Sequence, residues 1–355
     1  MKILGCILLL LSISQLIAQG PSFRNSLGAN LYGGYLASHH DYIQHLDAHT
    51  YGMEFRYSRI YTGERNSWAK DLRLPRRGLA LLLLDQGQPD LTGYSIACIP
   101  HTEFRIFGIR TGSFWFRMGT GIAWLTRRYD AESNRKQIAI GAHINPVMQF
   151  SFLWHQQISP AVELDLGIGL THFSNGNFNL PNLGINMPNL HAGFTLGKGE
   201  HGRQPKPVIS QTKWQWDADV ALHWATKEEG LVSFQRYQVG GLSFKAQLHR
   251  NRLSRFLAGI EFFKDNTYAS RNGNKRSLGS TLEFAFTVGH RLMIGRWILL
   301  KEIGIYAYKP DTIKDGWYQR IGMQYLFRNN LYAGVSLKTH QSISDYVQFT
   351  FGVFL

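Results

Sequence analysis

The sequence predicts an all-β protein, an antiparallel transmembrane β-barrel of an outer membrane with about 16 strands in two eight-stranded halves. Three observations predict this fold. Apolar and polar residues alternate in recurring segments of about ten residues with aromatic ends. The amino-terminal segment has the features of an export signal. The chain also ends inside its last alternating strand, and barrel closure pairs such a strand, whereas an open sheet edge is not viable in lipid. A secreted β-sandwich also alternates and is the alternative fold.

The expected export signal covers residues 1–19. Lys2 supplies a positive start, residues 7–11 an apolar stretch, and residues 17–19 a small-residue cleavage neighbourhood. Beyond it we find no apolar run of the ~20 residues that a transmembrane helix needs. Cys98 is the one cysteine outside the signal, so neither a disulfide framework nor a cysteine metal site is expected.

Alternation predicts eight strands before residue 199 and eight after residue 211. The expected strands lie near 27–37, 48–60, 77–85, 93–107, 113–126, 138–154, 161–173 and 188–198, and then near 212–225, 232–248, 254–264, 279–289, 297–308, 317–327, 331–340 and 344–355. Residues 199–211 form a polar linker rich in Gly and Pro. We expect one barrel half in 20–198 and a second half, a candidate degenerate repeat, in 212–355. One wide barrel and two small barrels both remain open.

The chain is basic, with a net charge of +14 and a pI near 9.8. Nucleic acid is an unsuitable partner for an exported chain, so the charge favours attraction to phosphate-bearing glycolipid headgroups of the membrane. The alternative is that the basic residues only line loops and the barrel lumen.

Parity predicts which face of the strand near 161–173 carries its last polar residues. The apolar residues of this strand are all even-numbered and would face lipid: Val162, Leu164, Leu166, Ile168 and Leu170. His172 and Ser174 share that parity, so they should project from the barrel exterior at its outer end. The parity of the returning strand assigns Asn186 to the same side.

These residue types predict ester hydrolysis. A histidine can deprotonate a neighbouring serine, and a third polar group can fix the imidazole tautomer. The following loop, rich in Gly and Asn, offers donors for an oxyanion. The plain structural alternative is that His172 and Ser174 only mark the membrane interface, where polar residues cost ~0–1 kcal/mol.

The runs His172-Phe-Ser-Asn-Gly176 and Pro181-Asn-Leu-Gly-Ile185 resemble the signature of PagL-type lipid A 3-O-deacylases. The resemblance implies an eight-stranded barrel in the Gram-negative outer membrane that hydrolyses an ester-linked acyl chain of lipid A in lipopolysaccharide. It implies Ser174 as the nucleophile and His172 as the general base. It also implies an oxyanion hole from the Asn175 and Gly176 backbone and the Asn182 side chain. The third catalytic residue of the family is a glutamate, and Asn186 is aligned with it here.

Other motifs carry less chemistry. A group of loop residues could in principle hold a metal, but their spacing matches no ligand pattern: His39, His40, Asp41, His45 and His49. We therefore expect no metal and no cofactor. His340 and Ser342 repeat the His-x-Ser spacing, but their parity points inward, which favours a structural role. A non-catalytic barrel derived from a deacylase, acting as a pore, a binding protein or a structural protein, is the alternative function.

Overall fold

The computed structural model describes residues 23–61, 67–197, 213–229, 235–271, 278–310, 315–341 and 343–355. The expected export signal, the linker 199–211, the proposed domain boundaries and Ser342 lie outside these residues. None of the described helices is long and apolar enough to cross a membrane.

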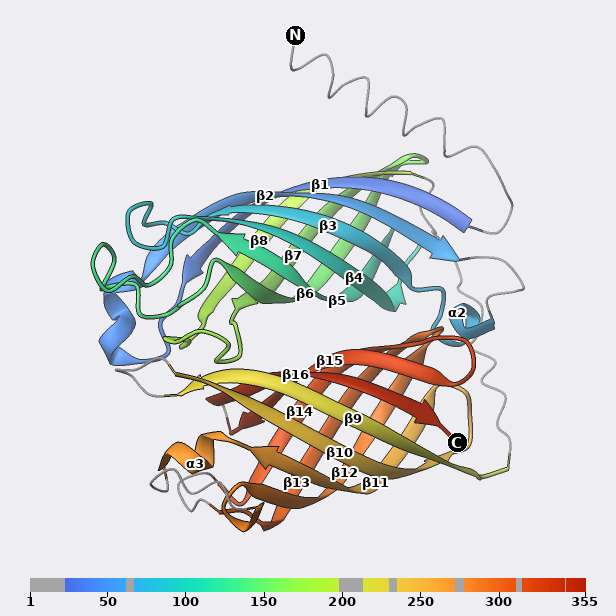
Figure 1. Ribbon diagram of the computed structural model, residues 1–355. Helices are drawn as coiled ribbons and strands as arrows, with labels where there is room; N and C mark the ends of the chain where they lie inside the picture. The colour runs from blue at the N-terminus through green and yellow to red at the C-terminus, as the bar shows by residue number, and fades with distance from the viewer. Residues whose placement is uncertain are drawn as a thin grey trace.

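Two closed antiparallel barrels of eight strands lie side by side (Figure 1). The first barrel closes where β8 pairs with β1, and the second closes where β16 pairs with β9. The strands of the first barrel are β1 (Phe23–Leu36), β2 (Ala48–Tyr61), β3 (Arg76–Asp85), β4 (Tyr94–Gly108), β5 (Gly112–Leu125), β6 (Ile144–Ser159), β7 (Val162–Phe173) and β8 (Ile185–Gly197). Those of the second are β9 (Gln215–Glu229), β10 (Gln235–His249), β11 (Ser254–Asp265), β12 (Leu282–Ile294), β13 (Trp297–Tyr308), β14 (Trp317–Leu326), β15 (Leu331–His340) and β16 (Ile343–Phe354). The predicted fold class is confirmed, and the open question of one barrel or two is answered as two.

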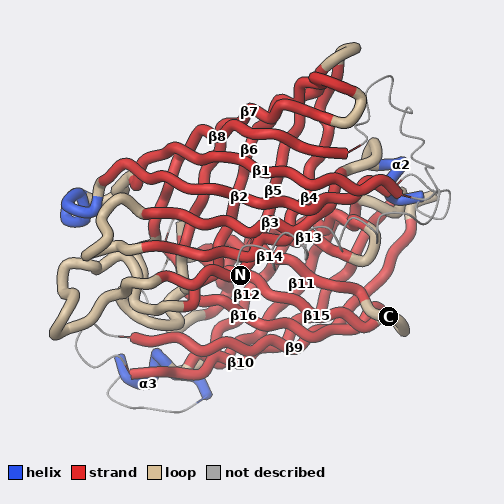
Figure 2. Tube along the Cα trace, turned by 90° about the horizontal axis from the view of Figure 1, so that it is seen from above, coloured by secondary structure: helices blue, strands red, loops and turns tan. Residues whose placement is uncertain are grey.

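Short helices mark the two ends of the barrels. α2 (Ser67–Asp71) and α3 (Thr267–Arg271) lie at opposite ends in both views (Figures 1 and 2). η1 (Asp41–Leu46) shares the end of α3, while η2 (Leu278–Ser280) precedes β12. Long loops of bacterial barrels are extracellular, so we call the end with η1 and α3 the outer end and the end with α2 the inner end.

The predicted strand at 138–154 is wrong at its boundaries, because β6 runs from Ile144 to Ser159. Residues before it belong to an outer loop, 126–143, in which the Tyr129 N–H donates to the Ile140 carbonyl at 2.7 Å. Ile140 also forms an isolated bridge with Asn182. Alternation alone therefore overextended the strand into a loop that packs beside the predicted site.

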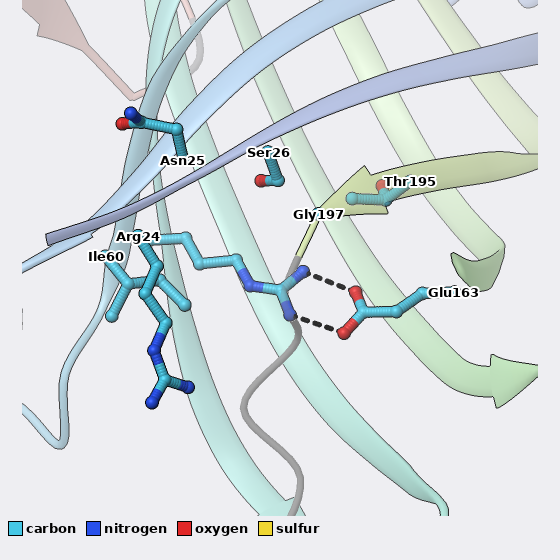
Figure 3. A pocket seen from close by; sticks show the side chains of 8 residues that line it. Arg24, Asn25, Ser26, Ile60, Glu163, Thr195 and Gly197 are labelled. Carbon is cyan, nitrogen blue, oxygen red and sulfur yellow. Dashed lines mark hydrogen bonds and ion pairs between the residues drawn. The ribbon is translucent and has the colours of Figure 1, made fainter. Parts of the chain in front are cut away.

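Charged pairs fill the lumen of both barrels. In the first, buried Arg56 bonds Asp165 at 2.6 Å, and Arg76 bonds both oxygens of Glu163 at 2.9 and 3.0 Å (Figure 3). Corresponding pairs in the second include Arg320 with Glu261 at 2.6 Å, Arg291 with Asp219 at 2.8 Å and Lys227 with Asp265 at 2.8 Å. An eight-stranded barrel is just wide enough for side chains to fill it. Each of these carboxylates is neutralised by a basic side chain inside the lumen. The candidate catalytic residues lie elsewhere, on the barrel exterior.

The barrels face each other with their outer walls, and contacts tie them together at the inner end. There Arg252, in the turn after β10, forms an ion pair with Asp71 of α2. A Cβ at Gly295, in the turn after β12, would lie 3.2 Å from the Trp68 ring. The long predicted connection between β2 and β3 thus contains a helix that docks the first barrel on the second.

Candidate active site

His172 and Ser174 stand on the exterior of the first barrel at its outer end, as parity predicts. His172 is half-buried near the end of β7 and lies directly opposite Asn186 of β8 in the strand register. Ser174 follows the strand and is only 8% exposed. Both side chains line a cleft whose far wall is the second barrel, a neighbour that strand parity did not indicate.

Asn186 orients the His172 ring. His172 Nδ1 lies 2.7 Å from Asn186 Oδ1. An amide oxygen only accepts, so Nδ1 carries the proton and Nε2 is left as the basic nitrogen. This tautomer is the one that a general base needs.

His39 continues this chain of hydrogen bonds, a role that no sequence motif indicated. Asn186 Nδ2 donates to His39 Nδ1 at 3.3 Å, and the Ala37 N–H donates to the Asn186 carbonyl at 2.9 Å. Partial burial and the neighbouring His40 lower the pKa of His39, so its ring stays neutral and can accept. Barrel closure brings His39, which follows β1, beside β8, and no local motif encodes that contact.

Two N–H donors converge on Ser174 Oγ. Asn182 Nδ2 lies 3.2 Å from Oγ, and the Gly176 N–H donates to it at 3.3 Å. The Asn175 N–H donates to Asn182 Oδ1 at 2.8 Å, and the Ser174 hydroxyl donates to the same oxygen at 3.3 Å, so both polar atoms of the amide reach the serine. Across the described residues, the hydrogen bonds of Ser174 Oγ run to Asn182 and Gly176 and not to His172.

Two glycines shape the loop that follows β7, residues 174–184, which we call the site loop. Gly184 has φ +81°, and a Cβ there would lie 2.9 Å from His172 Cε1. Gly176 has φ +61°, and its Cβ would lie 2.4 Å from Val347 Cγ2 of the second barrel. Both positions demand a left-handed backbone and close approach, so only glycine fits without strain.

The second barrel holds the site loop in place. The Glu228 N–H donates to the Asn177 carbonyl at 2.9 Å, and the Leu180 N–H donates to Glu228 Oε2 at 2.8 Å. Arg236 of β10 lies over the Phe178 ring at 4.3 Å. The conformation of the loop beside Ser174 therefore depends on residues of both barrels.

The loop histidines do not gather as a ligand set. His45 Nε2 bonds the Lys136 carbonyl at 2.8 Å, and His49 packs edge-on against Tyr35. Among the described residues, one His and carboxylate group has metal-like spacing: His155, Glu163 and Asp165. Its carboxylates already pair with arginines in the lumen, so this arrangement fits a structural network better than a cation site.

His340 points into the second barrel, as parity predicts. Its ring is buried, and Nε2 lies 3.0 Å from Tyr306 Oη. His340 therefore does not contribute to an exterior site, which agrees with the structural role expected for it.

Comparison with known proteins gave family and structural matches. Residues 38–195 match the family model described as lipid A 3-O-deacylase (PagL), and residues 214–354 match the one described as acyloxyacyl hydrolase, C-terminal domain. No curated protein matches the chain. Among solved structures, Neisserial surface protein A is 11% identical, covers 49% of this chain and 97% of its own, and gives a TM-score of 0.34. The outer membrane enzyme PagL is 14% identical, covers 46% of this chain and 97% of its own, and gives a TM-score of 0.30.

Proposed function

The chain belongs to the PagL family of lipid A deacylases, and on that basis we propose that it removes an ester-linked acyl chain from lipid A or a related glycolipid. The protein lies in the Gram-negative outer membrane as two closed barrels with apolar exteriors. One observation carries the proposal: an imidazole oriented through Nδ1 stands beside a serine whose Oγ meets two N–H donors.

The reaction follows the serine–histidine pattern. Ser174 Oγ attacks the ester carbonyl while His172 Nε2 takes the hydroxyl proton. The Gly176 N–H and Asn182 Nδ2 stabilise the tetrahedral oxyanion. When the intermediate collapses, the sugar hydroxyl leaves with the proton from His172, and the acyl group stays on Ser174. Water, deprotonated by the same imidazole, then releases the fatty acid and restores the serine.

Ser174 must exchange its partner for this reaction to start. Its hydroxyl is bonded to Asn182 and Gly176 in the substrate-free protein. Catalytic hydrogen bonds often tighten only in the complex: an ester carbonyl would take up the two N–H donors, and the hydroxyl would turn its proton from Asn182 Oδ1 to His172 Nε2. The two donors then change from solvating the nucleophile to solvating the oxyanion.

Asn186 stands where the family has a glutamate. Its amide orients the ring at 2.7 Å but brings no charge to offset the imidazolium that forms in the transition state. His39 accepts a hydrogen bond from the nitrogen of the same amide and so acts as a positioning residue. We infer a catalytic chain of Ser174, His172, Asn186 and His39 that works more slowly than one ending in a carboxylate.

Basic residues next to the site suit a phosphorylated headgroup. Arg127, Arg135 and Lys136 are exposed on the outer loop 126–143. That loop meets the site loop through the bridge from Ile140 to Asn182. Guanidinium and ammonium groups at the membrane surface attract the phosphates of lipid A and concentrate the substrate at the site.

A non-catalytic barrel is the second candidate, and the uncharged Asn186 is the observation that favours it. A pore is the weakest form of this alternative, since ion pairs fill the lumen of each eight-stranded barrel. A binding or structural protein derived from a deacylase fits the same residues without hydrolysis.

Mass spectrometry of lipid A tests the proposal. Cells expressing the wild type should lose one ester-linked acyl chain from lipid A, whereas His172→Ala and Ser174→Ala cells should keep it. Ser254→Ala is a matched control, because Ser254 Oγ bonds His290 Nε2 at 2.6 Å in the second barrel, away from the site. Full acylation in wild-type cells would reject the enzyme, and deacylation by Ser174→Ala would reject the nucleophile.

A further inference from the structure

An apolar cleft of about 880 Å³ separates the outer walls of the two barrels. Strands β2 to β7 form one wall and β12 to β16 form the other. This volume lies in the range of ~300–1,000 Å³ that small-molecule and lipid-like ligands occupy in proteins. The cleft is therefore large enough for a ligand and is not merely a packing defect.

The candidate site opens into this cleft at its outer end. His172 and Ser174 belong to its lining, and Leu337 of β15 and Val347 of β16 lie across from them near Gly176. β15 runs from the inner end at Leu331 to the outer end, so its outward residues descend from the site along the cleft. A chain attached to an ester at Ser174 would follow the same direction that acyl chains take from the outer leaflet into the bilayer.

The lining is suited to hydrocarbon. Its middle section is made by outward side chains of both barrels: Met118, Ile122, Met148 and Phe150 face Ala333, Val335 and Phe349. Arg59 and Arg77 lie at the inner end, beside Tyr57. No charged side chain lines that middle section among the described residues, so a charged ligand would find no ionic partner there, although Thr120 offers a hydroxyl between Met118 and Ile122.

We propose that the cleft binds the acyl chain of the glycolipid ester and that the second barrel is the wall that selects this chain. The assignment rests on the proposed function, because it needs the ester carbonyl at Ser174. An acyl chain gains little hydrophobic free energy by moving from lipid to protein, since lipid tails are equally apolar. The second wall supplies confinement instead: it holds the chain along β15 and aligns the ester with the nucleophile.

Photo-crosslinking of the full chain in lipid nanodiscs tests the cleft without requiring turnover. The protein carries Ser174→Ala, and the probe is a lipid A-type glycolipid with a diazirine either beside the ester or at the end of the acyl chain. The first probe should label the region of Leu337 and Val347, and the second the region of Ala333 and Met323. Equal labelling by a phosphatidylethanolamine carrying the same diazirine would overturn the proposal, since bulk lipid would then fill the cleft.

Two valine variants give the matched comparison. Val335 is 43% exposed and lines the cleft, whereas Val288 is 59% exposed on β12, outside it. Val335→Trp should lower glycolipid labelling at least fivefold and, with Ser174 intact, shift hydrolysis toward shorter acyl chains. Val288→Trp should change neither. Equal effects of both variants would overturn the proposal.

The experiments distinguish failure of the acyl-chain proposal for the cleft from failure of the proposed deacylase function. Hydrolysis by the wild type without labelling of the second barrel would overturn the cleft and leave the deacylase intact. Selective labelling without hydrolysis would overturn the deacylase, and the cleft would stand as a binding site for acyl chains.

Discussion

Asn186→Asp tests how much the missing charge limits the proposed reaction. Aspartate has nearly the shape of asparagine, so its carboxylate would take the place of the amide oxygen that lies 2.7 Å from His172 Nδ1. The neutral hydrogen bond would become a charge-assisted one, and its strength would grow as the ring becomes an imidazolium in the transition state.

The expected gain follows from hydrogen-bond energies. Bonds to charged groups contribute ~1.5–3 kcal/mol and neutral bonds ~0.5–1.5 kcal/mol, a difference of about 1–1.5 kcal/mol. His39 reduces this gain, because a carboxylate cannot donate to its Nδ1, and the ring must change its tautomer or take up a proton to restore the contact. Burial lowers the pKa of His39 and opposes that proton uptake. We therefore expect kcat to rise about fivefold, below the roughly tenfold that 1.4 kcal/mol would give.

The assay measures single-turnover release of fatty acid from a defined glycolipid by purified full-length protein. Asn186→Leu removes the acceptor and should lower the rate about tenfold or more, because Nδ1 is then unpaired in a half-buried site. Asn329→Asp adds the same charge to an exposed turn of the second barrel and should have no effect. A rate for Asn186→Asp at or below that of the wild type, with the barrel still folded, would refute the role assigned to Asn186.

Three further substitutions test the site and the fold. Gly184→Ala adds left-handed strain of ~1–2 kcal/mol and a Cβ against His172, so the hydrolysis rate should fall at least tenfold. Glu228→Ala removes an acceptor from the site loop and should lower the rate severalfold without changing the unfolding midpoint in urea. Arg117→Met removes the bond to Glu54 at 2.8 Å and leaves this buried carboxylate only Arg56 at 3.4 Å and Tyr32 at 3.0 Å, so the free energy of unfolding should fall by ~3 kcal/mol.

Matched controls separate these effects from general damage. Gly33→Ala places its Cβ in open space, Glu132→Ala alters an exposed outer loop, and Arg328→Met alters an exposed turn. Gly33→Ala and Glu132→Ala should leave the hydrolysis rate unchanged, and Arg328→Met should leave the free energy of unfolding unchanged. Full activity of Gly184→Ala or Glu228→Ala, or unchanged stability of Arg117→Met, would contradict the contacts on which these expectations rest.

Strand parity carried most of the sequence-based prediction of the fold. Alternation along β7 correctly assigned His172 to the exterior, and the residues of opposite parity, Glu163 and Asp165, lie in the lumen, because side chains of period two cannot change faces without a bulge. The same reasoning could not locate the second barrel. Val335 in the cleft and Val288 in the open are both outward apolar residues, and sequence does not distinguish a face that meets lipid from one that meets another barrel.

The candidate site was predictable only where its residues are close in the chain. The site loop supplies Ser174, Gly176 and Asn182, so their composition and spacing are visible in the sequence. His39 lies 147 residues from Asn186 and reaches it through barrel closure, which no local pattern encodes. The contacts of Glu228 depend on how two barrels dock, so they were equally out of reach.

The pairing of β8 with β1 also sets when the site becomes complete. His39 and Ala37 reach Asn186 only across this seam, and Glu228 reaches the site loop only after the second barrel has formed. A chain in transit through the periplasm, or a sheet still open in the membrane, carries His172 and Ser174 without these supports. Under the proposed function, the site would thus stay incomplete, and hydrolysis of membrane lipid would not begin, until these seams have closed.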